Sequence, residues 1–186
     1  MVEIPYGLTI LCVSLLWLLA RAWVWKRQRG IQLKRELALG LVYICLIVVV
    51  RVTFFPFFKV DGRVQPLLFE AAKMLPPRIN WVPLVNLLDY PDPREAVLNV
   101  AGNTLLFLPV GIVWPAVFRE LDRHWKVIAA GVGFSLCIEI LQLPFYDRVT
   151  DVDDLILNMF GFVVGYLLYL LAKAIRKHRR KHNESV

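Results

Sequence analysis

Residues 139–161 read E-I-L-Q-L-P-F-Y-D-R-V-T-D-V-D-D-L-I-L-N-M-F-G and join two strongly apolar runs of the chain. This stretch is unusually polar for its position, and its ionisable and amide side chains are Glu139, Gln142, Asp147, Arg148, Asp151, Asp153, Asp154 and Asn158. In lipid, a charged side chain costs about 3 kcal/mol or more unless it is paired or hydrated. So many polar groups between apolar runs therefore predict a functional site.

The composition around this stretch predicts an all-α integral membrane protein. The chain has 186 residues, of which 58% are hydrophobic and 20% charged, and its mean hydropathy of +0.57 is too high for a soluble domain of this size. A transmembrane helix needs about 20 apolar residues. We expect about five such helices, at residues 4–25, 37–58, 97–118, 127–143 and 152–172.

We divide the chain into three parts by composition. Residues 1–35 form an N-terminal anchor helix and a basic loop, residues 36–172 form the membrane domain, and residues 173–186 form a basic tail. The first apolar run begins after Glu3 and is followed by its positive charges, which is the reverse of a secretory signal peptide. We therefore expect this run to be an anchor.

The distribution of Lys and Arg predicts the orientation. If the N-terminus is outside, fourteen of the 22 basic residues lie in cytoplasmic segments, six lie in outer segments, and Arg21 and Arg51 lie within spans. Cytoplasmic segments of membrane proteins carry the excess of positive charge. This places the C-terminus in the cytoplasm. It also accounts for the net charge of +7 without nucleic acid, for which the sequence carries no binding motif.

The connection at residues 59–95 is interrupted by six prolines, so it cannot form a long helix. Its apolar stretches are too short to span a bilayer. We expect a long outer loop that carries short interfacial helices.

The spacing of the polar residues predicts which of them share a helix face. Asp151, Asp154 and Asn158 follow an i, i+3, i+7 pattern, continued by small residues at Gly161 and Gly165 that predict close helix packing. Asp153 is assigned to capping of the helix start. The predicted topology places the remaining polar groups in the outer half of the membrane. The expected ligand-binding residues are Arg51, Asn99, Asn103, Glu139, Gln142, Arg148, Asp151, Asp154 and Asn158.

At these residues the sequence resembles the VanZ-like family, which is named for an accessory protein of teicoplanin resistance in bacteria. The similarity covers about residues 36–172. The matching motifs are N-x-x-P at Asn80 and Pro83, N-x-x-G-N-x-L-L-F-x-P-x-G at residues 99–111, E-x-x-Q at Glu139 and Gln142, and R-x-x-D-x-x-D-x-x-x-N-x-x-G at residues 148–161. The resemblance implies a small bacterial membrane protein linked to glycopeptide tolerance, without a known cofactor.

Two functions remain open from the sequence. In the first, an outward-facing polar cavity binds a cell-wall precursor, a lipid or the glycopeptide itself, with Arg51 and Arg148 holding an anionic group. In the second, the protein is an intramembrane enzyme that modifies a lipid-linked or peptidoglycan precursor. Glu139 or Asp154 would then be the general base, and Arg148 would stabilise developing negative charge.

A third interpretation is purely structural, because polar pairs between membrane helices are common and are often worth only about 1 kcal/mol. We predict no metal centre and no cofactor. The three cysteines, Cys12, Cys45 and Cys137, lie inside apolar runs and are expected to be simple small hydrophobic residues. The sequence does not indicate an oligomeric state.

Overall fold

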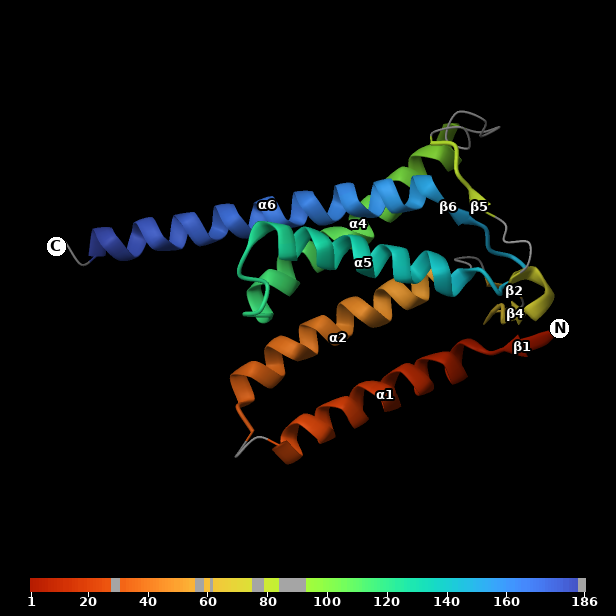
Figure 1. The fold of residues 1–186 in the computed structure, drawn as a ribbon, viewed down its shortest axis with the longest axis horizontal. Helices are drawn as coiled ribbons and strands as arrows, with labels where there is room; N and C mark the ends of the chain where they lie inside the picture. The colour runs from red at the N-terminus through yellow and green to blue at the C-terminus, as the bar shows by residue number, and fades with distance from the viewer. Residues whose placement is uncertain (28–30, 56–58, 61, 75–78, 84–92, 184–186) are drawn as a thin grey trace. The chain divides into compact units, whose positions relative to one another are not determined.

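Five long helices make up most of the protein in a computed structural model that describes residues 1–27, 31–55, 59–60, 62–74, 79–83 and 93–183 (Figure 1). All five are long and apolar enough to cross a membrane. They are α1 (Tyr6–Arg27), α2 (Leu33–Phe54), α4 (Pro93–Val117), α5 (His124–Gln142) and α6 (Val152–Asn183). The predicted all-α membrane fold with five spans is confirmed, and the chain is a multi-pass membrane protein.

The chain forms two compact units, which are described separately. Unit 1 contains Met1–Pro83 and Leu136–Val152, and therefore α1, α2 and the last turns of α5. Unit 2 contains Leu84–Ser135 and Asp153–Val186, and therefore α4, the first part of α5 and nearly all of α6.

In unit 1, α1 and α2 run antiparallel and are joined by polar contacts along their length (Figure 1). The hydroxyls of Ser14 and Tyr43 are 2.6 Å apart. Nearer the end of α1, Arg21 pairs with Glu36 at the start of α2, with 3.0 Å between Nε and Oε2 and a second bond from Nη2 to Oε1. An arginine inside a span is thereby neutralised, which the sequence analysis did not predict.

The last residues of the second predicted span (α2), which was expected to end at residue 58, lie outside the described residues. The helix stops at Phe54, and Phe55 is extended with φ −118° and ψ 138°. The next residue in the sequence is a proline, which disfavours the helical conformation of the residue before it. Pro56 therefore explains why the helix does not include Phe55.

The connection after α2 contains short strands as well as a helical turn. A two-stranded hairpin pairs β2 (Lys59–Val60) with β3 (Arg63–Val64), and Gly62 beside β3 has φ 75°, which favours glycine. β4 (Leu67–Phe69) pairs antiparallel with β1 (Val2–Ile4). The 3₁₀ turn η1 (Ala71–Met74) is a short helical piece of the predicted kind. The strands were not predicted. The partner of β4 is distant in sequence, whereas the β2–β3 hairpin is local but has only two residues in each strand.

Unit 2 is held together by very close packing of α4 against α6. A Cβ atom added to Gly161 would collide with the carbonyl oxygen of Thr104, and one added to Gly165 would collide with that of Leu108. Gly111 on α4 approaches the carbonyl oxygen of Phe162 in the same way. The predicted small-residue packing face at Gly161 and Gly165 is confirmed.

α6 continues well beyond the predicted end of its span at residue 172 and remains helical to Asn183. The residues that follow the span are mostly Lys, Arg, Ala, Ile and His, without proline or glycine. Lys, Arg and Ala favour helix, and nothing in the segment breaks it. The expected basic tail is therefore largely an extension of the last span.

Candidate functional site

The stretch at residues 139–161 contains the end of α5, a turn, the short strand β6 (Thr150–Asp151) and the start of α6. Its turn is fixed to β4 within unit 1. Tyr146 donates its backbone N–H to Leu68 O at 2.8 Å, and Glu70 donates to Pro144 O at 2.9 Å. The non-helical backbone thus finds hydrogen bonds to a segment far away in sequence, as a membrane-associated chain requires.

A first group of polar side chains, the unit-1 cluster, consists of Thr53, Asn80, Glu139, Gln142, Thr150 and Asp151. Its centre is Glu139, which is only 3% exposed. The Glu139 carboxylate accepts the backbone N–H of Asp151 at 3.1 Å, and the Glu139 carbonyl accepts the Thr150 hydroxyl at 2.9 Å. The last turn of α5 is therefore tied directly to β6.

Asn80 completes the opposite side of this cluster. β5 (Ile79–Asn80) runs parallel to β6, with Asn80 in register with Asp151, and the Asn80 amide donates to Asp151 Oδ1 at 3.1 Å. Asn80 was quoted in the N-x-x-P motif but was not among the predicted site residues. The motif was a usable signal, but the parallel pairing that brings it to Asp151 could not be seen from spacing.

Gln142 leaves one polar atom of the unit-1 cluster unmatched. Its amide nitrogen donates to Thr53 O at 2.7 Å. The side chain is 6% exposed, and its Oε1 accepts no hydrogen bond from the described part of the chain. A buried acceptor without a donor costs about 1–3 kcal/mol. A water molecule or a ligand N–H or O–H at this position would remove that cost.

The two arginines predicted for the site both belong to unit 1. Arg51, in the last turn of α2, donates from Nη1 to Phe55 O at 3.0 Å, and its guanidinium lies 5.5 Å from the centre of the Tyr6 ring. It thus satisfies a carbonyl at its own helix end. Arg148 lies in the turn after α5, where its backbone N–H donates to Phe145 O at 3.2 Å.

A second group, the unit-2 cluster, consists of Asn99, Asn103, Ser135, Asp154 and Asn158. Asn103 on α4 donates to Asp154 Oδ1 at 2.6 Å and to Asn99 Oδ1 at 3.3 Å. These three residues were predicted for the site, and the structure brings them together between α4 and α6.

The deepest part of the unit-2 cluster is a bond between α5 and α6. Asn158, which is 1% exposed, donates from Nδ2 to the hydroxyl of the fully buried Ser135 at 3.0 Å. Its Oδ1 is buried and receives no donor from the residues that the structure describes. Ser135 was not predicted, although it lies four residues before Glu139 on the same helix face.

The nine predicted binding residues therefore fall into two sets within the two units. Unit 1 holds Arg51, Glu139, Gln142, Arg148 and Asp151, and unit 2 holds Asn99, Asn103, Asp154 and Asn158. Asp153, which was assigned to capping, lies at the start of α6 but is only 4% exposed, so it is buried in the protein.

Both clusters are rich in hydrogen-bond acceptors, because they combine carboxylates with amide oxygens. Such groups recognise ligands that carry hydroxyl, amide or ammonium donors. In the described ranges, no three His, Cys, Asp or Glu side chains come together in an arrangement that could hold a metal ion.

The chain is similar to a known protein family and to a protein of Enterococcus faecium. The model of the VanZ/LLP1 family matches residues 41–173. The protein VanZ of Enterococcus faecium is 32% identical over 74 residues, which cover 40% of this chain and 45% of that protein. The matched region thus spans less than half the length of this relative. No solved structure matches the chain.

Proposed function

Because the chain belongs to the VanZ/LLP1 family, we propose that it is a cell-envelope protein of bacteria that lowers sensitivity to glycopeptide antibiotics of the teicoplanin type. The similarity to the protein VanZ of Enterococcus faecium supports this proposal. The protein acts by binding an envelope component or the antibiotic at polar side chains on the extracytoplasmic side of the membrane. The excess of Lys and Arg in the segments assigned to the cytoplasm supports this orientation.

The observation that carries the binding proposal is the burial of Glu139 within the unit-1 cluster. Its carboxylate is 3% exposed and accepts a backbone N–H, and the neighbouring Gln142 has a buried oxygen that no described residue satisfies. Burying a carboxylate costs free energy that hydrophobic packing would not, and this cost supports a binding role for Glu139.

The chemistry of the cluster indicates the class of ligand. Carboxylate and amide oxygens accept hydrogen bonds from the hydroxyl and amide groups of an amino sugar or a peptide, both of which a cell-wall precursor carries. Arg148 and Arg51 supply the positive charge that a phosphate or carboxylate on the same ligand requires.

The test compares a deletion strain complemented by wild-type protein with one complemented by Glu139→Gln. We expect deletion to increase teicoplanin sensitivity and wild-type protein to reverse this. The Glu139→Gln variant should not reverse it, because loss of a charge-assisted hydrogen bond weakens binding by about tenfold or more. The measurement is the minimum inhibitory concentration of teicoplanin at equal membrane levels of protein.

Glu120→Gln is the matched control, because Glu120 is an exposed carboxylate outside both clusters. It should complement fully. Full complementation by Glu139→Gln, or a deletion strain as tolerant as its parent, would refute the proposal.

A further inference from the structure

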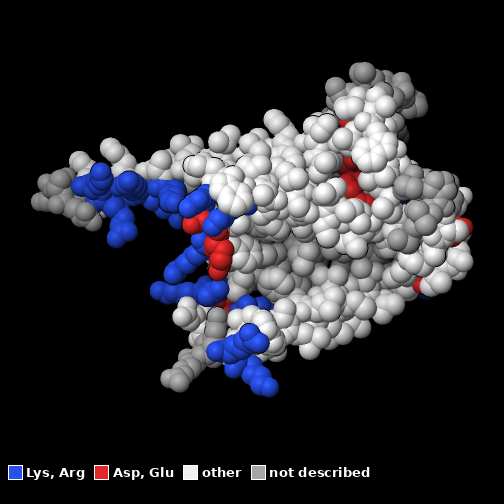
Figure 2. Space-filling view, in the orientation of Figure 1, with Lys and Arg blue, Asp and Glu red and all other residues white. Residues whose placement is uncertain are grey.

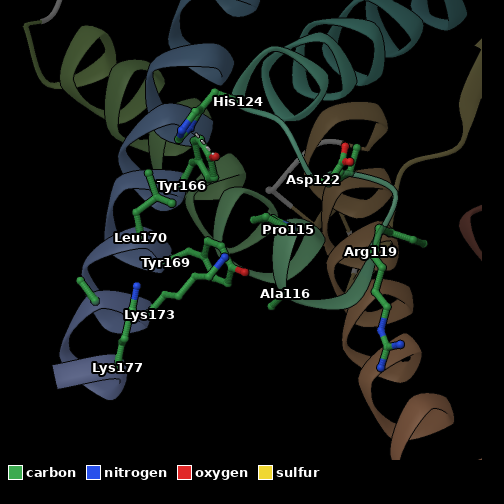
Figure 3. Close-up of a pocket in the computed structure, with 13 residues that line it drawn as sticks. Pro115, Ala116, Arg119, Asp122, His124, Tyr166, Tyr169, Leu170, Lys173 and Lys177 are labelled. Atoms are coloured by element: carbon green, nitrogen blue, oxygen red, sulfur yellow. Dashed lines mark hydrogen bonds between the residues drawn. The ribbon is translucent and has the colours of Figure 1, made fainter. Parts of the chain in front are cut away.

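Unit 2 contains a cavity of about 610 Å³ that lies apart from the polar cluster of that unit. It is bounded by the end of α4, the segment between α4 and α5, and the C-terminal half of α6 (Figure 3). Its charged and polar walls come from Arg119, Asp122, His124, Tyr169, Lys173 and Lys177. A cavity of this volume is within the range of small-molecule sites.

The charge of the cavity wall is positive. The wall carries three basic side chains, Arg119, Lys173 and Lys177. It carries one carboxylate, that of Asp122, which is already bonded to Lys126 Nζ at 2.7 Å. This hydrogen bond lowers the pKa of Asp122, so the carboxylate is ionised and its charge is compensated by Lys126 rather than by the cavity. Figure 2 shows that positive charge also dominates beyond the cavity, where Lys and Arg side chains gather on the C-terminal half of α6.

The cavity lies where the helices leave the membrane. The apolar segment of α4 ends at Val117, and about 20 residues of α6 from Val152 suffice to cross the hydrocarbon, which places Lys173 at the boundary. Aromatic residues are typical of this depth. Tyr166 OH is 2.8 Å from His124 Nδ1, and Lys173 Nζ lies 5.9 Å from the centre of the Tyr169 ring.

The wall changes character along α6, as Figure 3 shows. Lys177 and Lys173 form the polar end, Tyr169 and Tyr166 follow, and Leu170 and Pro115 supply apolar surface. A soluble anion would use only the basic end of this wall. A lipid would place its phosphate against the basic side chains and its glycerol and first methylenes against the apolar ones.

We propose that this cavity binds the phosphate of an anionic phospholipid headgroup at the membrane surface. Basic pockets between transmembrane helices bind such headgroups, and each Lys or Arg near an anionic membrane surface strengthens binding by about fivefold. Lys173 and Lys177, which lie four residues apart on α6 (Figure 3), contact the phosphate. The site uses none of the residues of the unit-1 cluster, on which the proposed function rests.

The test is native mass spectrometry of the full-length protein in a neutral detergent, titrated with phosphatidylglycerol or with phosphatidylcholine of the same acyl chains. We expect a single phosphatidylglycerol to bind much more tightly than phosphatidylcholine. The Lys173→Gln/Lys177→Gln double variant should lose about tenfold or more in this affinity. Inorganic phosphate should not displace the lipid.

The matched control is Arg123→Gln/Arg179→Gln, which removes two exposed charges from the same region outside the cavity wall. It should bind within about twofold of wild type, and Lys173→Arg/Lys177→Arg should keep most of the affinity because it keeps the charge. Three results would each overturn the proposal: equal binding of the two lipids, an equal loss in the control, or displacement by inorganic phosphate.

Discussion

The two polar clusters use the same side-chain pair in different backbone settings. In unit 1, Asn80 donates to Asp151 at 3.1 Å across a parallel pair of short strands. In unit 2, Asn103 donates to Asp154 at 2.6 Å between two helices. Each cluster also contains a buried amide, of Gln142 or Asn158, with an oxygen that no described residue satisfies.

The surroundings of the two clusters differ, and we propose that their roles differ as well. The unit-2 cluster lies beside glycines that let the α4 and α6 backbones touch, so its hydrogen bonds stabilise a contact that packing already defines. The unit-1 cluster is built on a turn and strand ends, where functional residues are more often found. We therefore infer a site from the backbone on which such a pair lies, and not from the Asn–Asp pair alone.

The largest effect is expected from closing the space between α4 and α6 in unit 2. Gly161→Leu should prevent folding, because even a Cβ atom at this position collides with the carbonyl oxygen of Thr104. Overpacking of this kind costs about 3 kcal/mol or more when rigid backbone is the neighbour. Gly133→Leu is the control, since no described atom lies within 4 Å of an added Cβ there. The measurement is the yield of monodisperse protein and its Tm in detergent.

An intermediate effect should separate the two Asn–Asp pairs. Asn103→Ala should lower stability by about 1–2 kcal/mol, because it removes a hydrogen bond to a carboxylate inside a helix interface. Asn80→Ala should change Tm much less and should abolish teicoplanin tolerance, since Asn80 orients Asp151 beside Glu139. Tm and the minimum inhibitory concentration are measured for both variants. Equal changes of Tm and of minimum inhibitory concentration in the two variants would mean that the two clusters have the same role.

The smallest effect concerns the bond between Ser135 and Asn158. A double-mutant cycle with Ser135→Ala and Asn158→Ala should give a coupling of about 0.6 kcal/mol, the average for side-chain hydrogen bonds between membrane helices. Urea or detergent unfolding of the four proteins measures it. A coupling of several kcal/mol would show that this pair is a cooperative centre, contrary to the structural role assigned to unit 2.

The helices could be predicted from the sequence because they depend on local properties. Hydropathy located all five spans, and the glycine spacing on α6 identified its packing face. The observed ends of the helices have local causes too, in Pro56 after α2 and in the helix-forming residues after position 172. These causes are present in the sequence, but the predicted boundaries were placed by hydropathy alone.

The contacts that could not be predicted are those between residues distant in sequence. Asn80 and Asp151 are 71 residues apart, and their contact requires the pairing of β5 with β6. Ser135 is a single small polar residue within an apolar helix, and its partner Asn158 is 23 residues away on another helix. The sequence predicted that Asp154 and Asn158 share a helix face, but their partners depend on which helices become neighbours.

The continuity of α6 has a mechanical consequence. Its 32 residues form a rod of about 48 Å, whereas the hydrocarbon core of a bilayer is about 30 Å thick. The basic end is thus a helical continuation of the span. A change of about 10° in the tilt of the helix about its start at Val152 would move Asn183 sideways by about 8 Å. A spin label at that position would therefore report on movements of the helix inside the membrane without being placed there.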